Sequence, residues 1–277
     1  RVFGGNDYNY ERTVAAIDAA IAQYGEAEPV AFPNTAYNLH ITKNIHKMKA
    51  FITGANKGIG FGIAKHLGLA GWTIILGARN QERASQAIAN LEAAGVNVAG
   101  WINIELADSA SIKQAAQTIA RQHPDLALLV NNAGIPGDMS QKSYETDMHH
   151  LQETMNVNFY GTYLLTQSLI PTIANNSGRI VNITVPTEVS PYWHPLAYVA
   201  SKAAQNTMTS IMAMEFAKDN IPVETYSIHP GPTTTDLNGN MDLPGFHTAD
   251  TVGQKVAEVI SDGQCHNGAP ATADLLR

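Results

Sequence analysis

The sequence predicts an α/β fold, a doubly wound parallel sheet with helices on both faces. From residue 48 onward, short apolar segments alternate with longer segments that have helical periodicity. A glycine-rich turn, Gly54-Ala-Asn-Lys-Gly58-Ile-Gly60, joins the first apolar segment to the first helical one. Strands that alternate with helices of this length form βαβ units, in which the strands are parallel.

The composition argues against a nucleic-acid or membrane role. Hydrophobic residues make up 44% and charged residues 15% of the 277, and the net charge is -7 without a long basic cluster. We therefore expect no nucleic-acid partner. No apolar run reaches the roughly eighteen residues of a membrane span, so we expect no membrane partner. The single cysteine, Cys265, excludes an internal disulfide and favours a reducing, cytoplasmic location.

Residues 1–47 do not share the pattern of the rest. We expect them to form an N-terminal extension or fused segment of unknown role, and 48–277 to form the single main domain. His40 and His46 have no clustered partners, and the sequence predicts no metal site.

The alternation defines the expected elements in chain order. Strands are predicted at 49–53, 73–78, 96–104, 126–130, 179–184 and 223–228. Helices are predicted at 61–70, 81–94, 109–121, 149–174, 198–216 and 249–260.

Two loops follow strands at the edge where ligands bind such sheets, beyond the carboxyl ends of the strands. In the first, Gly54 to Gly60, glycines let the backbone approach a phosphate, and the helix start offers free N–H groups. The second is Asn131-Asn132-Ala133-Gly134, after the fourth strand. A tight structural turn would also explain the first loop, so spacing alone leaves both interpretations open.

The segment Tyr198-Val-Ala-Ser-Lys202 opens an apolar helix. Residues four apart lie on one face of a helix, so the Lys202 ammonium is expected beside the Tyr198 phenol. A neighbouring positive charge favours phenolate and lowers the pKa of a tyrosine. Such a pair can exchange a proton with a substrate oxygen.

Together these motifs resemble the short-chain dehydrogenase/reductase family over about residues 48–262. The matching elements are Thr53-Gly-x-x-x-Gly58-Ile-Gly60, Asn131-Asn-Ala-Gly134, Asn158, Tyr198-x-x-x-Lys202, and Pro230-Gly231 with Thr235. The resemblance implies a Rossmann-type sheet and an oxidoreductase that interconverts a carbonyl compound and an alcohol by hydride transfer from or to a nicotinamide cofactor. The family's usual last strand has no good match in 267–277, and we expect it to be absent.

The resemblance also implies roles for individual residues. Tyr198 would give or take the proton, Lys202 would lower the pKa of Tyr198 and bind the nicotinamide ribose, and Asn158 would hold a water that links Lys202 to solvent. The implied cofactor-binding residues are Gly54, Asn56, Lys57, Gly58, Ile59, Gly60, Arg79, Asn131, Ala133, Gly134, Tyr198, Lys202, Pro230, Gly231 and Thr235.

The cofactor is expected to be NADPH/NADP rather than NAD. An NAD site places an acidic residue near the end of the second strand, about 20 residues past the glycine turn. Here that place is Ala78-Arg79, and the turn adds Lys57, so two cations and no carboxylate favour a 2′-phosphate. Asn56-Lys57 and Ala78-Arg79 also resemble the NADPH-dependent carbonyl reductases.

The family's active-site serine has no match. Thirteen residues before Tyr198 stands Val185, which has no donor. Thr184 precedes it, but side chains of a strand alternate faces. Thr187 shares the face of Val185 and lies beyond Pro186. We assign the hydroxyl to Thr184 and expect a working but modest reductase.

The sequence indicates only the general class of the substrate and of the assembly. Tyr192, Trp193 and His194 precede Tyr198, and with Met139 and Met241 they are candidate pocket walls for a small-molecule ketone or aldehyde. Methionines on the Tyr198 helix (Met208, Met212 and Met214) add apolar surface, which favours a homodimer or homotetramer.

Three other interpretations stay open. A dinucleotide-binding sensor or scaffold with little or no catalysis would keep the glycine turn and need no Tyr/Lys pair. A sugar-nucleotide epimerase or dehydratase shares that pair, but needs a larger domain after Pro230-Gly231. The extension at 1–47 could instead carry the main function as an interaction module.

Overall fold

A parallel sheet forms the centre of the protein. The computed structural model describes residues 48–186, 188, 194–268 and 270–272. Within them the sheet has the order β3-β2-β1-β4-β5-β6-β9, and each neighbouring pair is parallel. In that order the strands are β3 (Val98–Asn103), β2 (Thr73–Ala78), β1 (Lys49–Thr53), β4 (Leu126–Asn131), β5 (Arg179–Ile183), β6 (Glu224–His229) and β9 (Pro270–Thr272). The predicted Rossmann-type α/β class is confirmed. The extension predicted at 1–47 lies outside the described residues.

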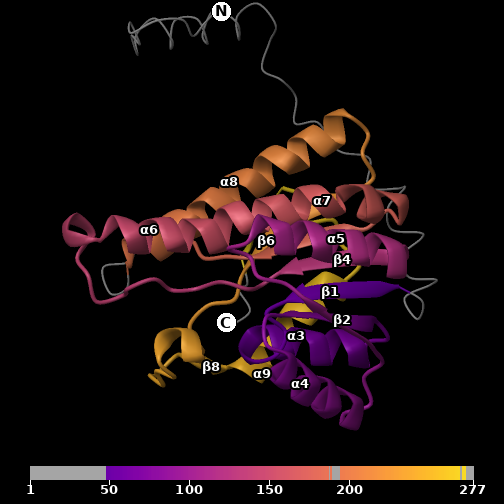
Figure 1. Ribbon diagram of the computed structural model, residues 1–277, viewed down its shortest axis with the longest axis horizontal. Helices are drawn as coiled ribbons and strands as arrows, with labels where there is room; N and C mark the ends of the chain where they lie inside the picture. Colours follow the sequence, from indigo (N-terminus) through magenta and orange to yellow (C-terminus); the bar gives the residue numbers. More distant parts are fainter. Residues whose placement is uncertain (1–47, 187, 189–193, 269, 273–277) are drawn as a thin grey trace, which may run out of the picture. The chain divides into compact units, whose positions relative to one another are not determined.

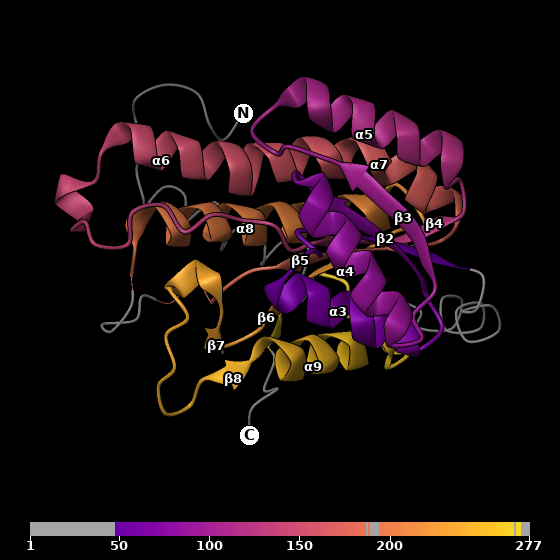
Figure 2. The same ribbon diagram turned by 60° about the horizontal axis from the view of Figure 1, so that its bottom comes forward.

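Helices cover both faces of the sheet (Figures 1 and 2). One layer holds α3 (Gly58–Leu69), α4 (Gln81–Ala93) and α9 (Ala249–Ser261). The other layer holds α5 (Ser109–Gln122), α6 (Met148–Met155), α7 (Thr162–Asn175) and α8 (Leu196–Lys218). Short elements complete the described part: η2 (Ser143–Glu145), η3 (Asn156–Gly161), β7 (Thr233–Thr234), η4 (Asp236–Asn238) and β8 (His247–Thr248).

The alternation of side chains along each strand gives the sheet one apolar core on each face. Ile52, Val130 and Ile228 belong to the cluster that includes residues of α3 and α9. Phe51, Leu129 and Ile180 belong to the cluster that includes residues of α5 and α7. None of the helices in the described part of the chain has the length and hydropathy that a bilayer crossing needs.

The strand order reverses between β1 and β4. The chain goes from β1 to β2 and β3 on one side, then returns to pair β4 with the other side of β1. The loops after β1 and β4 therefore leave the sheet next to each other and diverge to opposite faces. Ligands of doubly wound sheets bind at such a switch point.

The helix predicted over 149–174 is interrupted by a wider turn. Residues Asn156–Gly161 have π-helical hydrogen bonding between α6 and α7. Isolated π turns inside α-helices occur frequently at functional sites. The apolar periodicity of the segment does not register this change, because helical geometry continues on both sides.

The expectation that the last strand is absent is wrong. β9 pairs in parallel with β6, with Ser227 opposite Pro270 and His229 opposite Thr272. An edge strand of this kind needs only backbone partners, so the poor motif match over 267–277 did not reveal it.

The methionines of α8 divide between core and surface. Met208 is buried, Met212 packs against the core, and Met214 is exposed. Ile211 is also exposed, so some apolar surface remains on this helix. Homo-oligomer formation stays a prediction.

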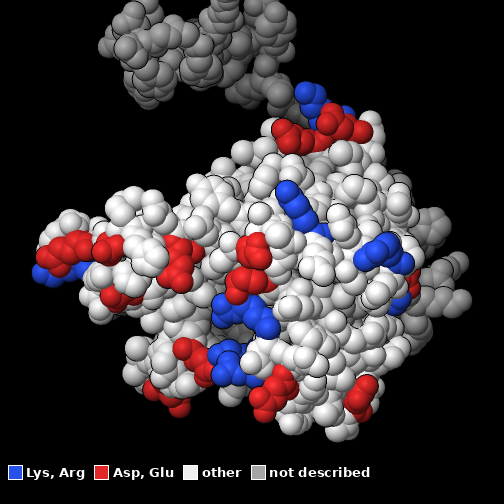
Figure 3. Space-filling model, viewed as in Figure 1, with Lys and Arg blue, Asp and Glu red and all other residues white. Residues whose placement is uncertain are grey.

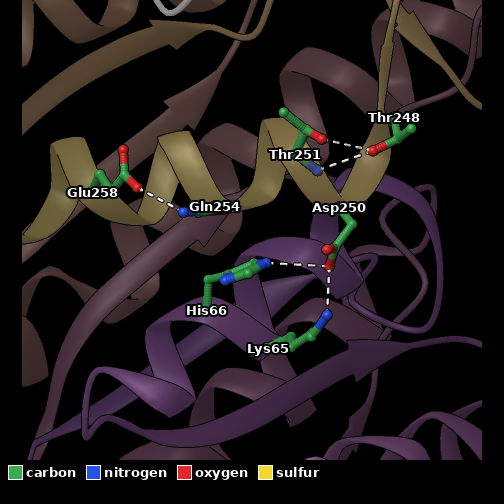
Figure 4. A network of polar contacts seen from close by, with 7 residues as sticks. All are labelled: Lys65, His66, Thr248, Asp250, Thr251, Gln254 and Glu258. Carbon is green, nitrogen blue, oxygen red and sulfur yellow. Dashed lines mark hydrogen bonds and ion pairs between the residues drawn. The ribbon is translucent and has the colours of Figure 1, made fainter.

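Helices α3 and α9 cross in close contact, and Figure 4 shows the polar contacts beside this crossing. A Cβ at Gly253 would lie against backbone atoms of Gly62 and 2.6 Å from Ile63 N. At the start of α9, Asp250 Oδ1 accepts from Lys65 Nζ at 2.9 Å and lies 3.2 Å from His66 Nε2. Because Gly62 and Gly253 have no side chains, the two helices can approach closely. The Lys65–Asp250 ion pair fixes the position of one helix along the other.

We expect Gly253→Ala to lower the free energy of unfolding by about 1–3 kcal/mol, because the new methyl group meets backbone that cannot rotate away. In an exposed helix the same change would stabilise by about 1 kcal/mol. Urea denaturation measures the difference. Glu258→Ala, at an exposed position on α9, is the control and should stay within about 0.5 kcal/mol of wild type. A stabilised Gly253→Ala would contradict the close crossing.

Candidate active site

The Thr53 side chain joins the two loops at the switch point. Its Oγ1 accepts from the backbone N–H of Asn132 and of Ala133, both at 3.0 Å, and donates to Val130 O at 3.3 Å. The Asn132 amide donates in turn to Thr53 O at 2.9 Å. These bonds hold the end of β4 against the end of β1, so the glycine turn and the loop after β4 form one rigid floor.

Glycines shape the turn between β1 and α3. Gly54 and Gly58 have φ values of +66° and +59°, which other residues adopt only with strain. At Gly60 a Cβ would meet the Asn132 amide and would lie 2.5 Å from Gly54 O. Lys57, the N-cap of α3, makes no side-chain bond to the first turn of the helix. The N–H groups of that turn thus remain available to a ligand.

A cavity of about 560 Å³ lies above this floor. Its volume is within the range of small-molecule and cofactor sites, about 300–1,000 Å³. Figure 3 shows a hollow in this face with Lys and Arg side chains along its border. Most of the residues predicted for the site line the cavity: Gly54, Asn56, Lys57, Gly58, Ile59, Arg79, Ala133, Gly134, Thr184, Tyr198, Lys202, Pro230 and Thr235. These predicted residues come from six separate loops and helices, and the fold brings them to one cavity.

Four predicted residues are not among those that line the cavity: Gly60, Asn131, Asn158 and Gly231. The Asn131 amide instead points into the core, where its Nδ2 donates to Thr166 Oγ1 at 2.9 Å and to Asn182 Oδ1 at 2.8 Å. Asn131 is the last residue of β4, and its side chain joins α7 and β5. The structure therefore places Asn131 beneath the site.

Tyr198 and Lys202 lie on one buried face of α8, as their spacing predicted. Lys202 Nζ is 5.8 Å from the centroid of the Tyr198 ring, and it donates to Ile183 O at 2.8 Å. Burial raises the pKa of the Tyr198 phenol to about 12. Burial also lowers the pKa of the Lys202 ammonium to about 7.

These values differ from the expectation that Lys202 lowers the pKa of Tyr198. The expectation counted only the Coulomb attraction between the ammonium and a phenolate. Both groups are almost completely buried, and desolvation disfavours the charged form of each. In this structure the loss of hydration outweighs the attraction, and the phenol is held in its protonated form.

Thr184 presents a hydroxyl without a partner to the cavity. Its side chain is 1% exposed, and its Oγ1 makes no hydrogen bond. We expected Thr184 and Val185 to point to opposite faces, as neighbouring residues of a strand do. This does not apply, because β5 ends at Ile183, before both residues. Val185 is not among the lining residues, and its carbonyl accepts from Asn206 Nδ2 at 2.9 Å. Thr187 lies outside the described residues.

Asn158 lies in the π turn, and its side chain fixes the loop after β4. Its Oδ1 accepts from Ile135 N at 2.8 Å, and its Nδ2 donates to Ile135 O at 2.9 Å and to Ser201 Oγ at 3.0 Å. Its backbone carbonyl accepts from Gln205 Nε2 at 2.6 Å. The side chain thus has a structural task, and the water-holding role stays a prediction.

The sequence argument counted two cations, Arg79 and Lys57, and no carboxylate at the expected place of a 2′-phosphate. This count is wrong, because each cation pairs with a carboxylate in the fold. Arg79 Nη1 lies 3.1 Å from Glu105 Oε2, and Lys57 Nζ lies 2.6 Å from Asp236 Oδ2. Lys57 and Asp236 are 179 residues apart in the chain, so only the fold brings them together. The hydrogen bond from Lys57 lowers the pKa of Asp236, which keeps this carboxylate charged.

The expected substrate walls are only partly described. Tyr192 and Trp193 lie outside the described residues, and His194 is exposed. Met139 and Met241 are exposed by 37% and 47% and do not line the cavity. Among the described residues no group of three or more His, Cys, Asp and Glu is arranged to hold a metal ion.

Several residues of the site were given no role from the sequence, although Thr53 and Asn132 stand in its motifs. Thr53, Asn132 and Ile135 line the cavity and join its loops, while Ser201 and Gln205 connect α8 to the π turn. Two signals were present in the sequence: a threonine directly before the first glycine, and polar residues at helical spacing from Lys202 on an otherwise apolar helix.

The fold and the site define a protein that binds a ligand at the switch point of a doubly wound sheet, with a Tyr/Lys pair over the ligand cavity. A family model described as short chain dehydrogenase matches residues 48–243. The chain therefore belongs to the short-chain dehydrogenase/reductase family, whose members are oxidoreductases that act on small molecules.

Relatives and solved structures agree with this assignment. A fatty acyl-CoA reductase of Acinetobacter baylyi is 32% identical over 65% of this chain and 61% of its own length. Estradiol 17-beta-dehydrogenase 2 of mouse is 28% identical over 72% of this chain and 51% of its own length. The chain thus spans about half to three-fifths of these two relatives.

Among solved structures, an NADPH-bound carbonyl reductase from chicken fatty liver has a TM-score of 0.71 at 25% identity, over 81% of this chain and 95% of its own. A short-chain dehydrogenase of Burkholderia cenocepacia in complex with NADP has a TM-score of 0.69 at 28% identity, also over 81% of this chain and 95% of its own.

The low pKa of Lys202 makes stability depend on pH in a defined direction. Between pH 7 and about 10.5 the unfolded chain binds one more proton at this residue than the folded chain, so folded stability rises with pH in that window. Lys202→Met should therefore stabilise most at or below pH 7, and its advantage should shrink as the pH rises toward 10.

Urea denaturation at several pH values measures this effect. Lys113→Met removes an exposed lysine of α5 and is the control, which should run parallel to wild type. If the free energy of unfolding of Lys202→Met and of wild type changes with pH in parallel, folding does not change the pKa of Lys202.

Proposed function

We propose that this protein is an NADPH-dependent oxidoreductase that interconverts a ketone or aldehyde and the corresponding alcohol. One observation carries the proposal: the glycine turn that can accept a dinucleotide and the Tyr198/Lys202 pair with Thr184 line a single cavity. A binding protein without catalysis would have no need of a buried Tyr/Lys pair at that place.

The residues present fit a nicotinamide dinucleotide. A side chain at Gly54 or Gly60 would meet Asn132 of the loop after β4 and displace the turn. The start of α3 offers N–H groups and a positive dipole end for a pyrophosphate. When bound there, the dinucleotide would supply or accept the hydride. Ala133, Gly134, Pro230 and Thr235 lie along the same cavity and would hold its nicotinamide end.

Tyr198 would donate the proton to the substrate oxygen during reduction. With its pKa raised to about 12 by burial, the phenol is fully protonated near neutral pH, so the donor form is always present. An alkoxide is more basic than such a phenolate, and the transfer is downhill. The reverse reaction needs the phenolate, which burial disfavours at neutral pH.

Lys202 would return the proton to Tyr198. Its pKa of about 7 is far below that of the phenol, so the ammonium can protonate a neighbouring phenolate at neutral pH. Asn158 holds the Ile135 backbone and Ser201 in place around this pair, and we keep for it the role of binding a relay water.

Thr184 would hold the substrate oxygen. Its hydroxyl is buried, unpartnered and on the wall of the cavity that also contains Tyr198. A buried polar group without a partner costs free energy, and a substrate oxygen at this place would supply the partner. Thr184 would thus take the role of the family's serine, whose position is occupied by Val185 in this chain.

Arg79 and Lys57 support NADPH as the preferred cofactor. Both border the cavity, and a guanidinium forms two parallel hydrogen bonds with a phosphate. The chicken and Burkholderia structures named above contain NADPH and NADP. The cytoplasmic location and the homodimer or homotetramer stay predictions.

We expect Tyr198→Phe to lower turnover by about 10²–10⁴-fold, because the variant keeps the ring and loses the proton donor. NADPH binding should change little. Absorbance of reduced nicotinamide with a panel of ketones, aldehydes and diketones measures turnover, and nicotinamide fluorescence measures binding. Tyr163→Phe in α7, whose hydroxyl only contacts Gln167 at the surface, is the control. Full activity of Tyr198→Phe would refute the mechanism.

Removal of the Thr184 hydroxyl should slow turnover by about 10²–10³-fold, the usual effect of one lost oxyanion donor. Thr184→Val tests this with nearly the same volume, and Thr184→Ser should restore most of the rate. Val185→Ser is the comparison. If Thr184→Val is harmless and Val185→Ser raises turnover, the donor position is 185 and the assignment to Thr184 is wrong.

A further inference from the structure

Thr184 is the first residue beyond the end of β5, and α8 holds its backbone from both sides. We infer that Asn206 of α8 is a positioning residue for the reaction: its amide holds the backbone carbonyl of Val185 and so aims the Thr184 hydroxyl into the cavity. The inference rests on the proposed function, because it takes this hydroxyl as the group that holds the substrate oxygen. Asn206 itself is not among the residues that line the cavity.

The pairing of β5 with β6 ends just before this point. Ile183 lies opposite Ile228 in the last register of the pair, and Thr184 N still donates to Ile228 O at 2.9 Å. Val185 is half-buried, and the residue after it, Pro186, has no backbone N–H with which to continue a ladder. Pairing with β6 therefore accounts for the course of the chain only as far as the N–H of Thr184.

Two side chains of α8 hold the carbonyls on either side of Thr184. Lys202 Nζ donates to Ile183 O at 2.8 Å, and one turn further along the helix Asn206 Nδ2 donates to Val185 O at 2.9 Å. Residues four apart lie on one face of a helix, so both side chains reach the same segment. The bond from Asn206 holds the chain where pairing with β6 no longer does.

A fixed backbone at this place also fixes the direction of the hydroxyl. The side chain of a threonine is branched at Cβ, so its χ1 torsion takes few values for a given backbone. Thr184 Oγ1 is buried, makes no hydrogen bond and belongs to the wall of the cavity. Because an unpartnered buried hydroxyl costs free energy, a backbone free to turn would bring it to an acceptor. The bond from Asn206 opposes that movement.

Asn206 contributes more to position than to stability. Its Nδ2 makes the bond to Val185, but its Oδ1 is buried without a partner. A leucine of similar size would lose one hydrogen bond and would also remove the unpartnered oxygen, so the two effects on folding oppose each other. The exchange should therefore change turnover far more than it changes the resistance of the protein to urea.

Steady-state kinetics of the full chain, with NADPH and a carbonyl compound that wild type reduces, tests the inference. Asn206→Leu and Asn206→Asp both remove the donor, and each should lower kcat about 10–100-fold, because a shift of about 1 Å in a reacting geometry can cost about 10²-fold. KM and the Kd of NADPH should change by less than about threefold, since the oxyanion contact is made mainly in the transition state. The urea midpoint should stay close to that of wild type. Asn90→Leu, at an exposed position of α4, is the control and should match wild type in kcat.

A double-mutant cycle with Thr184→Val measures whether Asn206 acts through that hydroxyl. Thr184→Val alone should slow turnover about 10²–10³-fold. In this background Asn206→Leu should slow the enzyme by no more than about twofold further, because the hydroxyl that it positions is already absent. An equal loss in both backgrounds would mean that Asn206 acts elsewhere, and the inference would be wrong.

The outcomes separate the inference from the proposed function. If wild type reduces no carbonyl compound with NADPH, the proposed function fails and the inference falls with it. If wild type is active, Thr184→Val is slow and Asn206→Leu matches wild type, the inference alone fails. If Thr184→Val is harmless, the assignment of the oxyanion donor and the inference both fail, while the role of Tyr198 stands.

Discussion

The hydroxyl of Thr53 is the contact on which the rest of the site depends. It accepts from two backbone N–H groups of the loop after β4 while it stands at the end of β1. Parallel strands alone bring the two loops close, but the backbone N–H of Ala133 takes its acceptor from Thr53, whereas that of Asn132 also reaches Val130 O at 3.1 Å. Because buried N–H groups need partners, this one side chain decides how the second loop turns and where Gly134 and Ile135 lie. Gly60 then has to be a glycine, since any side chain would meet the Asn132 amide.

Burial, more than charge pairing, sets the chemistry of the Tyr/Lys pair. Both residues face the sheet from α8, and desolvation moves each toward its neutral form. In the proposed mechanism, a phenol that stays protonated would be the proton donor, and a lysine that titrates near neutrality would resupply the proton. The same physics explains why the spacing of Tyr198 and Lys202 located the site but gave the wrong sign for the pKa of the tyrosine. Spacing reports proximity and carries no information on solvent.

What could be predicted from the sequence was local in the chain. The strands, the helices, the glycine turn and the Tyr/Lys face each follow from residues within one or two turns of one another. The partners that were missed are distant. Glu105 meets Arg79 through the β2/β3 register, Asp236 meets Lys57 across the cavity, and Asn131 reaches Asn182 beneath it. The π turn at Asn158 also escaped prediction, because its apolar pattern fits an α-helix as well. The strand β9 was missed because its pairing uses the backbone.

The buried face of α8 shows why the position of Tyr198 is specified so closely. This face is rich in polar groups: Ser201, Gln205 and Thr209 are all buried. Ser201 accepts from the Asn158 amide, Gln205 donates to the Asn158 carbonyl, and Thr209 accepts from Asn182. An apolar face could slide along the sheet at little cost, whereas a shift here would break several buried hydrogen bonds at once. The π turn is what brings the Asn158 carbonyl and amide to face α8 and Ile135 together. Helix α8 is thus held by polar contacts to the π turn, and Asn158 of that turn also binds Ile135 of the loop after β4, so Tyr198 and the floor of the cavity share one frame.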